Sequence, residues 1–358
     1  MNESKNFTDQ KLLEEKKIQF SSMLIFIIPF LGILGNVIIC VSIKIEKKLQ
    51  KRFNYFLLSL ACSDLLNSIF VMPVSAWKFI DDTFVFWKSI WFCTFWFSLD
   101  VFFTSSSIIH LCVISLDRYI VLRNPFKSHR YRKKCFKIGL TCSWILSAAV
   151  AGPIFIFAYR IQHQEKISYK GCGPNETYFI VLSTVLTFYL PLLIMTLTYS
   201  LTVISLKKQN KEMRELMFRN NNSGIDSNYD SMNKSLSHLS LDEPPRYGHA
   251  GPSKGFRIFK SQNTMIKHFD QSKKAIKTLG ILFALFVFCY TPFFVFYVAS
   301  INCPSCQGLP ILLLEWLAYS GSALNPIVYI ILYPLFRKTL YKIVCCNCLL
   351  NIVDNYHC

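Results

Sequence analysis

Residues 22–43 read SMLIFIIPFLGILGNVIICVSI, a run without a charged side chain. An α-helix rises 1.5 Å per residue, so about 20 residues cross the roughly 30 Å of hydrocarbon in a membrane. Further apolar runs follow at residues 55–77, 89–116, 136–158, 177–206, 275–301 and 309–333. Backbone polar groups in hydrocarbon must be satisfied within their own segment, which favours helices. The sequence therefore predicts an all-α membrane protein, a bundle of seven transmembrane helices.

The composition of the whole chain agrees with a membrane protein. Of its 358 residues, 52% are apolar and only 17% are charged, and the mean hydropathy is +0.34. The formal net charge of +18 suggests a nucleic-acid partner when taken alone. The basic residues gather after alternate runs, however, as the positive-inside rule requires of cytosolic segments. We therefore expect no nucleic-acid partner, and a multi-pass protein of the plasma membrane with an extracellular amino terminus.

The predicted topology divides the chain into five parts. Residues 1–21 form an extracellular amino terminus, and residues 22–206 hold five helices with their loops. Residues 207–272 are rich in Asn, Ser and Lys with little apolar periodicity, and are expected to form a disordered cytosolic loop. Residues 273–333 hold the last two helices. The cytosolic tail, residues 334–358, begins with an amphipathic segment that is expected to form a short helix.

Cysteines and glycosylation sequons predict the covalent modifications. Cys93 and Cys172 both face the oxidising outer side and are predicted to form a disulfide. Cys303 and Cys306 share a short outer loop, where a local disulfide is favoured over a metal site with only two ligands. Glycosylation is expected at three outer asparagines, namely Asn2, Asn6 and Asn175. Three cysteines after the amphipathic segment suit palmitoylation, with ordinary free thiols as the alternative: Cys345, Cys346 and Cys348.

Two aspartates inside the predicted spans are candidates for function, because an ionisable group in a membrane is costly unless paired or hydrated. Asp100 lies seven residues after Cys93, about 10 Å deeper than the outer end of its helix. No lysine or arginine is evident at its level. This carboxylate is therefore expected to anchor a protonated amine, the alternative being a structural aspartate bridged by water. Asp64 lies mid-membrane, where other polar residues can join it in holding water or a sodium ion: Asn36, Ser107, Ser322 and Asn325.

Polar and aromatic side chains lie at the depth of Asp100. Ser183 and Thr187 share one face of the predicted fifth helix, with Thr184 beside them. These hydroxyls either contact a ligand or bond their own helix. Aromatic residues on the sixth and seventh helices either pack the bundle or enclose a ligand through apolar and cation–π contacts: Phe293, Phe294, Trp316 and Tyr319.

The inner end of the third predicted helix carries Asp117-Arg118-Tyr119, which lies 17 residues beyond Asp100. That separation is about 25 Å along a helix, so one helix reaches both faces of the membrane. An arginine at this depth needs a partner, which is either Asp117 or an incoming protein. Three prolines within later spans remove backbone hydrogen bonds and offer hinges for a two-state bundle: Pro191, Pro292 and Pro326.

These residues resemble the rhodopsin-like G-protein-coupled receptors over nearly all of the membrane portion. The resemblance rests on motifs in the family's order: Gly35-Asn36, Leu60-Ala-Cys-Ser-Asp64, Asp117-Arg-Tyr119, Trp144, Pro191, Tyr199, Phe286, Cys289, Pro292 and Asn325-Pro-Ile-Val-Tyr329. Within that class the chain looks like the biogenic-amine receptors. The resemblance implies an amine salt bridge to Asp100 within the following ligand-binding set: Asp100, Thr104, Ser183, Thr184, Thr187, Tyr290, Phe293, Phe294, Trp316 and Tyr319.

The resemblance also implies that ligand binding moves the sixth helix and opens a cytosolic cleft for a heterotrimeric G protein. The residues expected to serve coupling and activation are Asp117, Arg118, Tyr119, Phe126, Tyr199, Pro292, Asn325, Pro326 and Tyr329. Arrestin and a receptor kinase are expected as further partners. No cofactor is expected other than an allosteric sodium ion at Asp64, Ser107, Ser322 and Asn325.

Four positions depart from the family pattern. Tyr290 stands where the family usually has a tryptophan, and Gly321 replaces a common asparagine beside the sodium site. Ser272 occupies the position of an acid that commonly pairs with Arg118 at rest, so signalling without ligand is expected. Glu315 is an acid near the mouth of the expected pocket without an assigned role.

Other functions fit the sequence less well than an amine receptor does. The same bundle tuned to a peptide or a lipid is the main alternative. A transporter or channel predicts an inverted repeat, broken helices or a continuous polar lining, and none is visible. An enzyme is disfavoured because no nucleophile with its base, phosphate loop or metal-ligand set appears. The combination of Asp100, Trp316 and Tyr319 favours the amine receptor.

Overall fold

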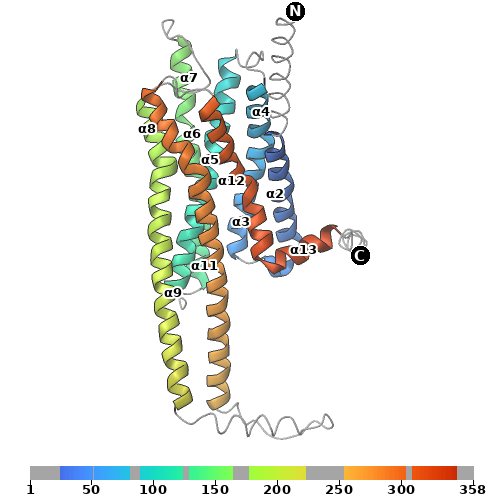
Figure 1. Ribbon diagram of the computed structural model, residues 1–358, viewed down its shortest axis with the longest axis vertical. Helices are drawn as coiled ribbons and strands as arrows, with labels where there is room; N and C mark the ends of the chain where they lie inside the picture. Colours follow the sequence, from blue (N-terminus) through green and yellow to red (C-terminus); the bar gives the residue numbers. More distant parts are fainter. Residues whose placement is uncertain are drawn as a thin grey trace, which may run out of the picture.

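The computed structural model describes residues 25–50, 52–80, 89–123, 129–163, 177–222, 254–303 and 309–344. Within these ranges the chain is helical and contains no strand, and the helices run side by side in one bundle (Figure 1). Seven helical segments of this described part are long and apolar enough to cross a membrane. The predicted fold class is therefore confirmed.

The seven spans follow the predicted apolar runs closely. Several spans are built from two or three successive helical elements. The first three spans are α2 (Ile27–Ile45); α3 (Arg52–Leu66) with η2 (Asn67–Val71) and α4 (Met72–Ile80); and α5 (Ile90–Arg123). The last four are α6 (His129–Ala151) with α7 (Pro153–His163); α8 (Thr177–Thr184) with η4 (Val185–Tyr189) and α9 (Leu190–Asn222); α11 (Lys254–Ala299) with η5 (Ser300–Asn302); and α12 (Leu309–Leu332). A short turn, η1 (Lys47–Leu49), follows α2, and α13 (Pro334–Val344) follows α12.

Two spans contain a π-helical turn, and a proline explains each one. Pro73 follows η2 closely, and Pro191 follows η4. Proline lacks an N–H and its ring clashes with the carbonyl four residues earlier, so the helix widens there without breaking. The widened turn at η4 places Thr187 and Phe188 in the interior, where both are buried.

The central helix of the bundle is α5, which packs against α3, α6, α7 and α9. Its middle section is buried on every side and consists largely of small or polar residues, from Ser105 to Cys112. Small side chains allow neighbouring helices to approach closely, which is how membrane helices associate in the absence of a hydrophobic driving force. A large apolar core around Ile39, Phe188 and Phe286 fills the inner part of the bundle. A smaller core around Trp96 and Trp316 lies beside Asp100.

Residues 207–272 differ in part from the prediction of a disordered loop. Helix α9 continues to Asn222 and α11 begins at Lys254, and both extend beyond the rest of the bundle (Figure 1). The extension of α9 carries good helix formers, and a helix already formed in the membrane extends without a new nucleus. The side-chain amide of Gln209 also donates to the carbonyl of Leu122 at 3.1 Å, which ties the extension to α5. Residues 223–253 lie outside the described part.

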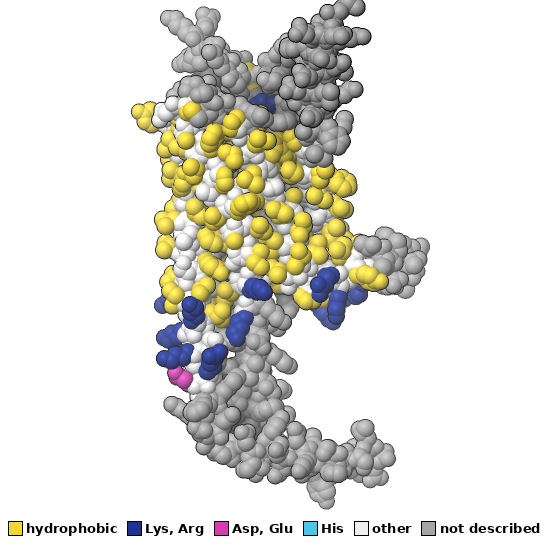
Figure 2. All heavy atoms as spheres, viewed as in Figure 1, with side chains coloured by type: hydrophobic (Ala, Val, Ile, Leu, Met, Phe, Trp, Pro, Cys, Tyr) yellow, Lys and Arg dark blue, Asp and Glu magenta, His cyan; other side chains and the backbone are white. Residues whose placement is uncertain are grey.

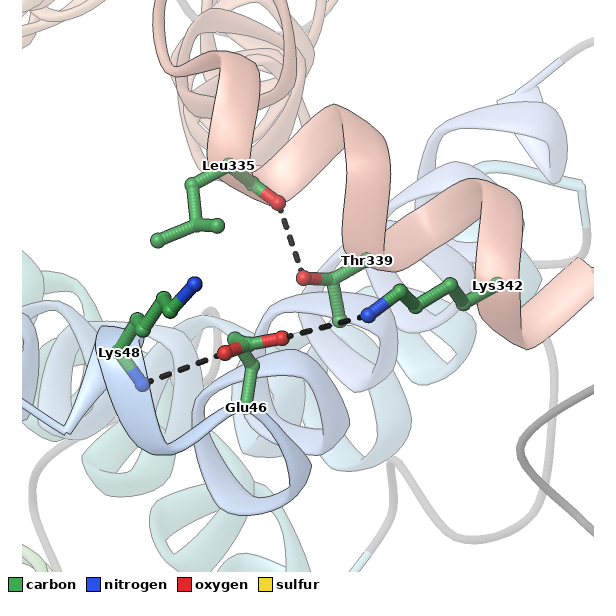
Figure 3. A network of polar contacts seen from close by, with 5 residues as sticks. All are labelled: Glu46, Lys48, Leu335, Thr339 and Lys342. Carbon is green, nitrogen blue, oxygen red and sulfur yellow. Dashed lines mark hydrogen bonds and ion pairs between the residues drawn. The ribbon is translucent and has the colours of Figure 1, made fainter. Parts of the chain in front are cut away.

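The predicted amphipathic helix after the last span is present as α13, which turns away from the axis of α12 (Figure 1). Phe336 buries its ring against the bundle and is only 1% exposed. Glu46 accepts a hydrogen bond from the backbone N–H of Lys48 at 3.3 Å and lies 3.7 Å from the ammonium of Lys342 (Figure 3). An ion pair at the surface contributes at most about 1 kcal/mol, whereas burial of a phenylalanine contributes about 1.5–3 kcal/mol. Packing of Phe336 therefore holds α13 in place, and Glu46 orients it.

The surface of the bundle divides into an apolar belt and a basic end. Hydrophobic side chains cover the middle of the molecule, and Lys and Arg gather below them, at the end where α13 lies (Figure 2). Large exposed residues such as Phe30, Phe288 and Ile331 belong to this belt. Hydrocarbon solvates such residues at no cost, so their exposure is what a membrane protein requires.

Close packing between α2 and α12 at Gly35 provides a test of the fold. A Cβ atom added at Gly35 would lie 2.9 Å from the Pro326 ring. We expect Gly35→Leu to force the two helices apart at a cost of about 1–3 kcal/mol. The melting temperature of the purified protein should fall. The control is Leu34→Ala, at a neighbouring lipid-facing position that is 48% exposed, and it should leave the melting temperature nearly unchanged. Equal melting temperatures for Gly35→Leu and the unchanged protein would contradict this close packing of α2 on α12.

Candidate functional site

The structure gathers two acids from different helices near the outer end of the bundle. Asp100 on α5 accepts a hydrogen bond from the Thr104 hydroxyl at 3.3 Å. Glu315 on α12 accepts a hydrogen bond from the Tyr319 hydroxyl at 2.7 Å. The same Tyr319 hydroxyl lies within reach of the Asp100 carboxylate, so the two acids share one neighbour. We call these four residues and Lys78 the outer cluster.

Lys78 on α4 corrects the expectation that no lysine or arginine lies at the level of Asp100. Its ammonium attracts the carboxylates of both Asp100 and Glu315, and it lies 5.5 Å from the centroid of the Trp96 ring. Lys78 lies seven residues beyond Val71, whose carbonyl accepts from the Trp96 indole one turn outside Asp100, so its backbone lies farther out than that of Asp100. The long lysine side chain can reach back toward Asp100 along the apolar surface, and counting helical turns along the backbone does not reveal that reach. With two acids and one ammonium, the outer cluster holds more acidic than basic side chains among the described residues.

Trp316 and Tyr319, both predicted to face a ligand, pack together beside Asp100. Their rings meet edge to face at 5.4 Å, and each residue is 4% exposed. Both belong to the small apolar core that includes Trp96 and Phe103. The two predicted roles of these aromatics are therefore compatible, because rings that pack the bundle also border the acidic group.

Phe293 and Phe294 on α11 have different surroundings. Phe294 stacks on Phe188 with ring centroids 4.6 Å apart and is 6% exposed. Phe293 stacks on Tyr297 at 5.6 Å and lies only partly in the interior. The sequence did not single out Phe188, which reaches the interior through the widened turn η4. Its position just before Pro191 was the signal that could have revealed it.

The three hydroxyl residues of the fifth span also differ in their surroundings. The Ser183 hydroxyl donates to the carbonyl of Ile180 at 3.1 Å, so it bonds its own helix. Thr184 and Thr187 are buried in the interior. Of the three hydroxyls predicted to meet a ligand, these two threonines remain the better candidates.

The mid-membrane residues predicted around Asp64 come together as an inner cluster of Asp64, Ser107, Ser322 and Asn325. The Ser107 hydroxyl donates to one carboxylate oxygen of Asp64 at 2.6 Å, and the Asn325 amide donates to the other at 2.9 Å. The Ser322 hydroxyl faces the same carboxylate but forms no hydrogen bond of good geometry within the described part of the chain. Asn36 joins from α2 by donating to the carbonyls of Gly32 at 2.9 Å and Ser322 at 3.4 Å.

Tyr290 and Gly321, which both depart from the family pattern, form one packing unit. A Cβ atom at position 321 would lie 2.9 Å from a ring carbon of Tyr290. Glycine on α12 therefore makes the space that the tyrosine ring on α11 occupies. The Tyr290 hydroxyl approaches Ser322, and its ring packs against Phe286 at 5.3 Å. Tyr290 thus contacts the inner cluster directly.

At the inner end of α5, Arg118 forms an ion pair with Asp117, one of its two predicted partners. Its guanidinium also lies over the Phe53 ring, 4.2 Å from the centroid. The Tyr199 hydroxyl packs against Gly280, where a Cβ atom would approach it to 2.4 Å. Tyr329 buries its ring next to Phe336 of α13. The predicted contact residue Phe126 and the side chain of Ser272 lie outside the described part.

A buried histidine network escaped the sequence interpretation. His110 on α5 lies 2.8 Å from the Ser59 hydroxyl, 3.1 Å from that of Ser143 and 2.7 Å from the Ser106 carbonyl. The Trp144 indole N–H donates to Ser59 at 3.1 Å. These bonds join α3, α5 and α6, which gives His110 a structural role.

Two of the predicted modification sites fall partly within the described residues. Cys93 and Cys303 are each disulfide-bonded. Their predicted partners, Cys172 and Cys306, lie outside the described residues. So do the predicted sites of glycosylation and palmitoylation, namely Asn2, Asn6, Asn175, Cys345, Cys346 and Cys348.

The chain matches the family described as 7 transmembrane receptor (rhodopsin family) over residues 35–329, which is most of its length. It therefore belongs to the rhodopsin family of seven-transmembrane receptors. Similar proteins include the 5-hydroxytryptamine receptor 2C of Rattus norvegicus, 32% identical over 343 residues, and that of Homo sapiens, 31% identical over 339 residues. Each alignment covers 91% of this chain and 72% of the relative.

Family membership confirms that the chain is a receptor and not an enzyme, and that it is a multi-pass protein of the plasma membrane. The relatives carry the name of a biogenic amine, so the predicted resemblance to that receptor group is also confirmed.

The contact between Tyr290 and Gly321 predicts a coupled pair of substitutions. Gly321→Asn alone should push the Tyr290 ring out of place and destabilise the receptor by about 1–3 kcal/mol. Combining it with Tyr290→Ala should remove the clash and recover part of that loss. The check is a double-mutant cycle of melting temperatures on purified receptor. Strictly additive effects would show that the two residues do not share space.

Proposed function

We propose that this receptor binds a small protonated amine at the outer cluster and then activates a heterotrimeric G protein at the inner end of α5. The observation that carries the proposal is Asp100, a partly buried acid in a cluster of two acids and one ammonium, where it accepts a hydrogen bond from Thr104. Its hydrogen bond from Thr104 is long, at 3.3 Å, which leaves lone pairs for a stronger donor. An ammonium ion supplies both the missing charge and a charge-assisted hydrogen bond.

The neighbouring aromatic residues suit the remainder of such a ligand. Tyr319 and Trp316 border the acidic group and provide faces for cation–π attraction. Phe294 and Phe188 form a stacked apolar pair between α11 and η4. An aromatic amine places its cationic end at Asp100 and its ring toward this pair, with Thr184 and Thr187 as candidate partners for polar groups on the ring.

The path from the outer cluster to the cytosolic end runs through α11 and α12. Tyr290 adjoins the inner cluster, and Asn325 of that cluster begins the segment that ends at Tyr329. Pro292 and Pro326 lie inside α11 and α12 and offer the hinges for helix movement. Movement of α11 away from α5 then exposes Arg118 and Tyr199 to the G protein. Arrestin and a receptor kinase use the same cytosolic face.

Orientation and ion binding complete the proposal. The basic end, where α13 lies, faces the cytosol, which places the amino terminus outside the cell. The inner cluster binds a sodium ion, because carboxylate, hydroxyl and amide oxygens are the ligands that hard cations prefer. The Ser322 hydroxyl, buried without a bond among the described residues, is the group that such an ion would engage.

Asp100→Asn should reduce the potency of an activating amine by at least about a hundredfold, since removal of one partner from a buried charge pair costs about 3–5 kcal/mol. The measurement is a dose–response series with a panel of monoamines, reading cAMP and calcium in transfected cells with matched surface expression. Glu215→Gln is the control, because it makes the same change of acid to amide on a residue that is 66% exposed on α9. An unchanged dose response for Asp100→Asn would contradict the proposed amine site.

Ser272→Glu tests the expectation of signalling without ligand. An acid at this position on α11 can pair with Arg118 and stabilise the resting bundle, so basal output should fall. The measurement is second messenger without ligand at equal surface expression, with Ser272→Gln as the uncharged control. Equal basal output in Ser272→Glu and the unchanged receptor would contradict the expectation.

A further inference from the structure

The Tyr319 hydroxyl donates its single hydrogen bond to Glu315. A phenol has a single O–H donor, and in this structure it lies 2.7 Å from Glu315 Oε1. The Asp100 carboxylate lies within reach of the same oxygen but competes for the same proton. Because the hydroxyl donates to Glu315, Asp100 accepts one hydrogen bond fewer. The lone pairs of the Tyr319 oxygen then point away from Glu315.

Two further contacts hold Glu315 in this role. The Ser75 hydroxyl donates to the same Oε1 atom at 3.4 Å, and the Lys78 ammonium attracts the carboxylate. Glu315 and Tyr319 are also four residues apart on α12, so they lie on one face of the helix. The carboxylate is thus held toward Tyr319 by groups from both α4 and α12.

The consequence for a ligand concerns the number of its N–H donors. A cation at Asp100 faces two acceptors, the carboxylate and the oxygen of Tyr319. A primary ammonium has three N–H groups and can bond both acceptors at once. A tertiary ammonium has one N–H, so it bonds Asp100 and sets its alkyl groups against the other acceptor, which stays unsatisfied. An acceptor without a donor at a desolvated site is costly.

Building on the proposed amine site, we propose that Glu315 is a positioning residue that makes the receptor select primary amines over tertiary amines. It acts through Tyr319, by fixing the direction of the hydroxyl, and does not need to touch the ligand itself. Both kinds of amine carry the same single positive charge, so charge alone does not distinguish them. The hydrogen-bond arrangement does.

The test compares primary amines with their N,N-dimethyl derivatives, using 5-hydroxytryptamine and 2-phenylethylamine as the two parent compounds. Half-maximal concentrations for G-protein activation are measured in cells with matched surface expression. The unchanged receptor should prefer each primary amine at least about tenfold, the value of one good hydrogen bond to a charged group. Glu315→Val frees the Tyr319 hydroxyl to donate to Asp100, so the preference should fall to within about threefold.

Three further variants sharpen the result. Glu315→Gln keeps an acceptor for Tyr319 without the charge and should retain the preference, which a purely electrostatic role would not predict. Tyr319→Phe removes the second acceptor and should abolish the preference, so it decides the question if Glu315→Val does not reach the surface. Leu313→Val, on a residue that is 54% exposed on the same helix, is the control and should keep the preference.

The outcomes separate this inference from the function on which it rests. If none of the four amines activates the unchanged receptor, the proposed amine function fails. If amines activate it but primary and tertiary forms are equally potent, or if Glu315→Val leaves a tenfold preference intact, the role of Glu315 is overturned while the amine site stands.

Discussion

Hydrocarbon offers no hydrogen bonds, so each polar side chain in the interior of this bundle needs a partner from the protein itself. Asp64 meets that requirement by accepting bonds from Ser107 and Asn325, which joins α3, α5 and α12. His110 does the same for α3, α5 and α6 through Ser59 and Ser143. An unmatched buried polar group is costly, so these two networks fix the lateral order of three helices, α3, α6 and α12, around α5. The apolar side chains then fill the space that this order leaves.

In the outer cluster such matching is incomplete. Two carboxylates face one ammonium, and one phenol proton serves two acceptors. Functional sites are commonly the places where a structure departs from full internal satisfaction, because a ligand completes it. Tyr290 and Gly321 lie between this cluster and the network around Asp64. A ligand that reorganises the outer cluster therefore acts close to the interactions that hold the bundle together.

The correct predictions rest on sequence properties that translate directly into a residue's position along a helix. Span length follows from hydrophobic thickness, and depth follows from counting turns, so the seven spans and the set around Asp64 could be predicted. Lys78 was missed because its position depends on the reach of a flexible side chain, and Phe188 because a π-turn shifted the helical register. The partnership of Tyr290 with Gly321 depends on shape across two helices, which one sequence does not display. The extension of α9 was missed because composition describes an isolated segment, whereas this segment continues a formed helix.

Helix α11 is a single element from Lys254 to Ala299 with Pro292 near its outer end. The part on the inner side of that proline is about 57 Å long at 1.5 Å per residue. A bend of about ten degrees at Pro292 moves the far tip by about 10 Å, while atoms next to the proline shift by less than a bond length. A bend at Pro292 would thus make the helix a lever whose short arm lies among the aromatic residues of the proposed ligand site. A rearrangement on the scale of one hydrogen bond would become, at the far tip, a displacement as wide as another helix.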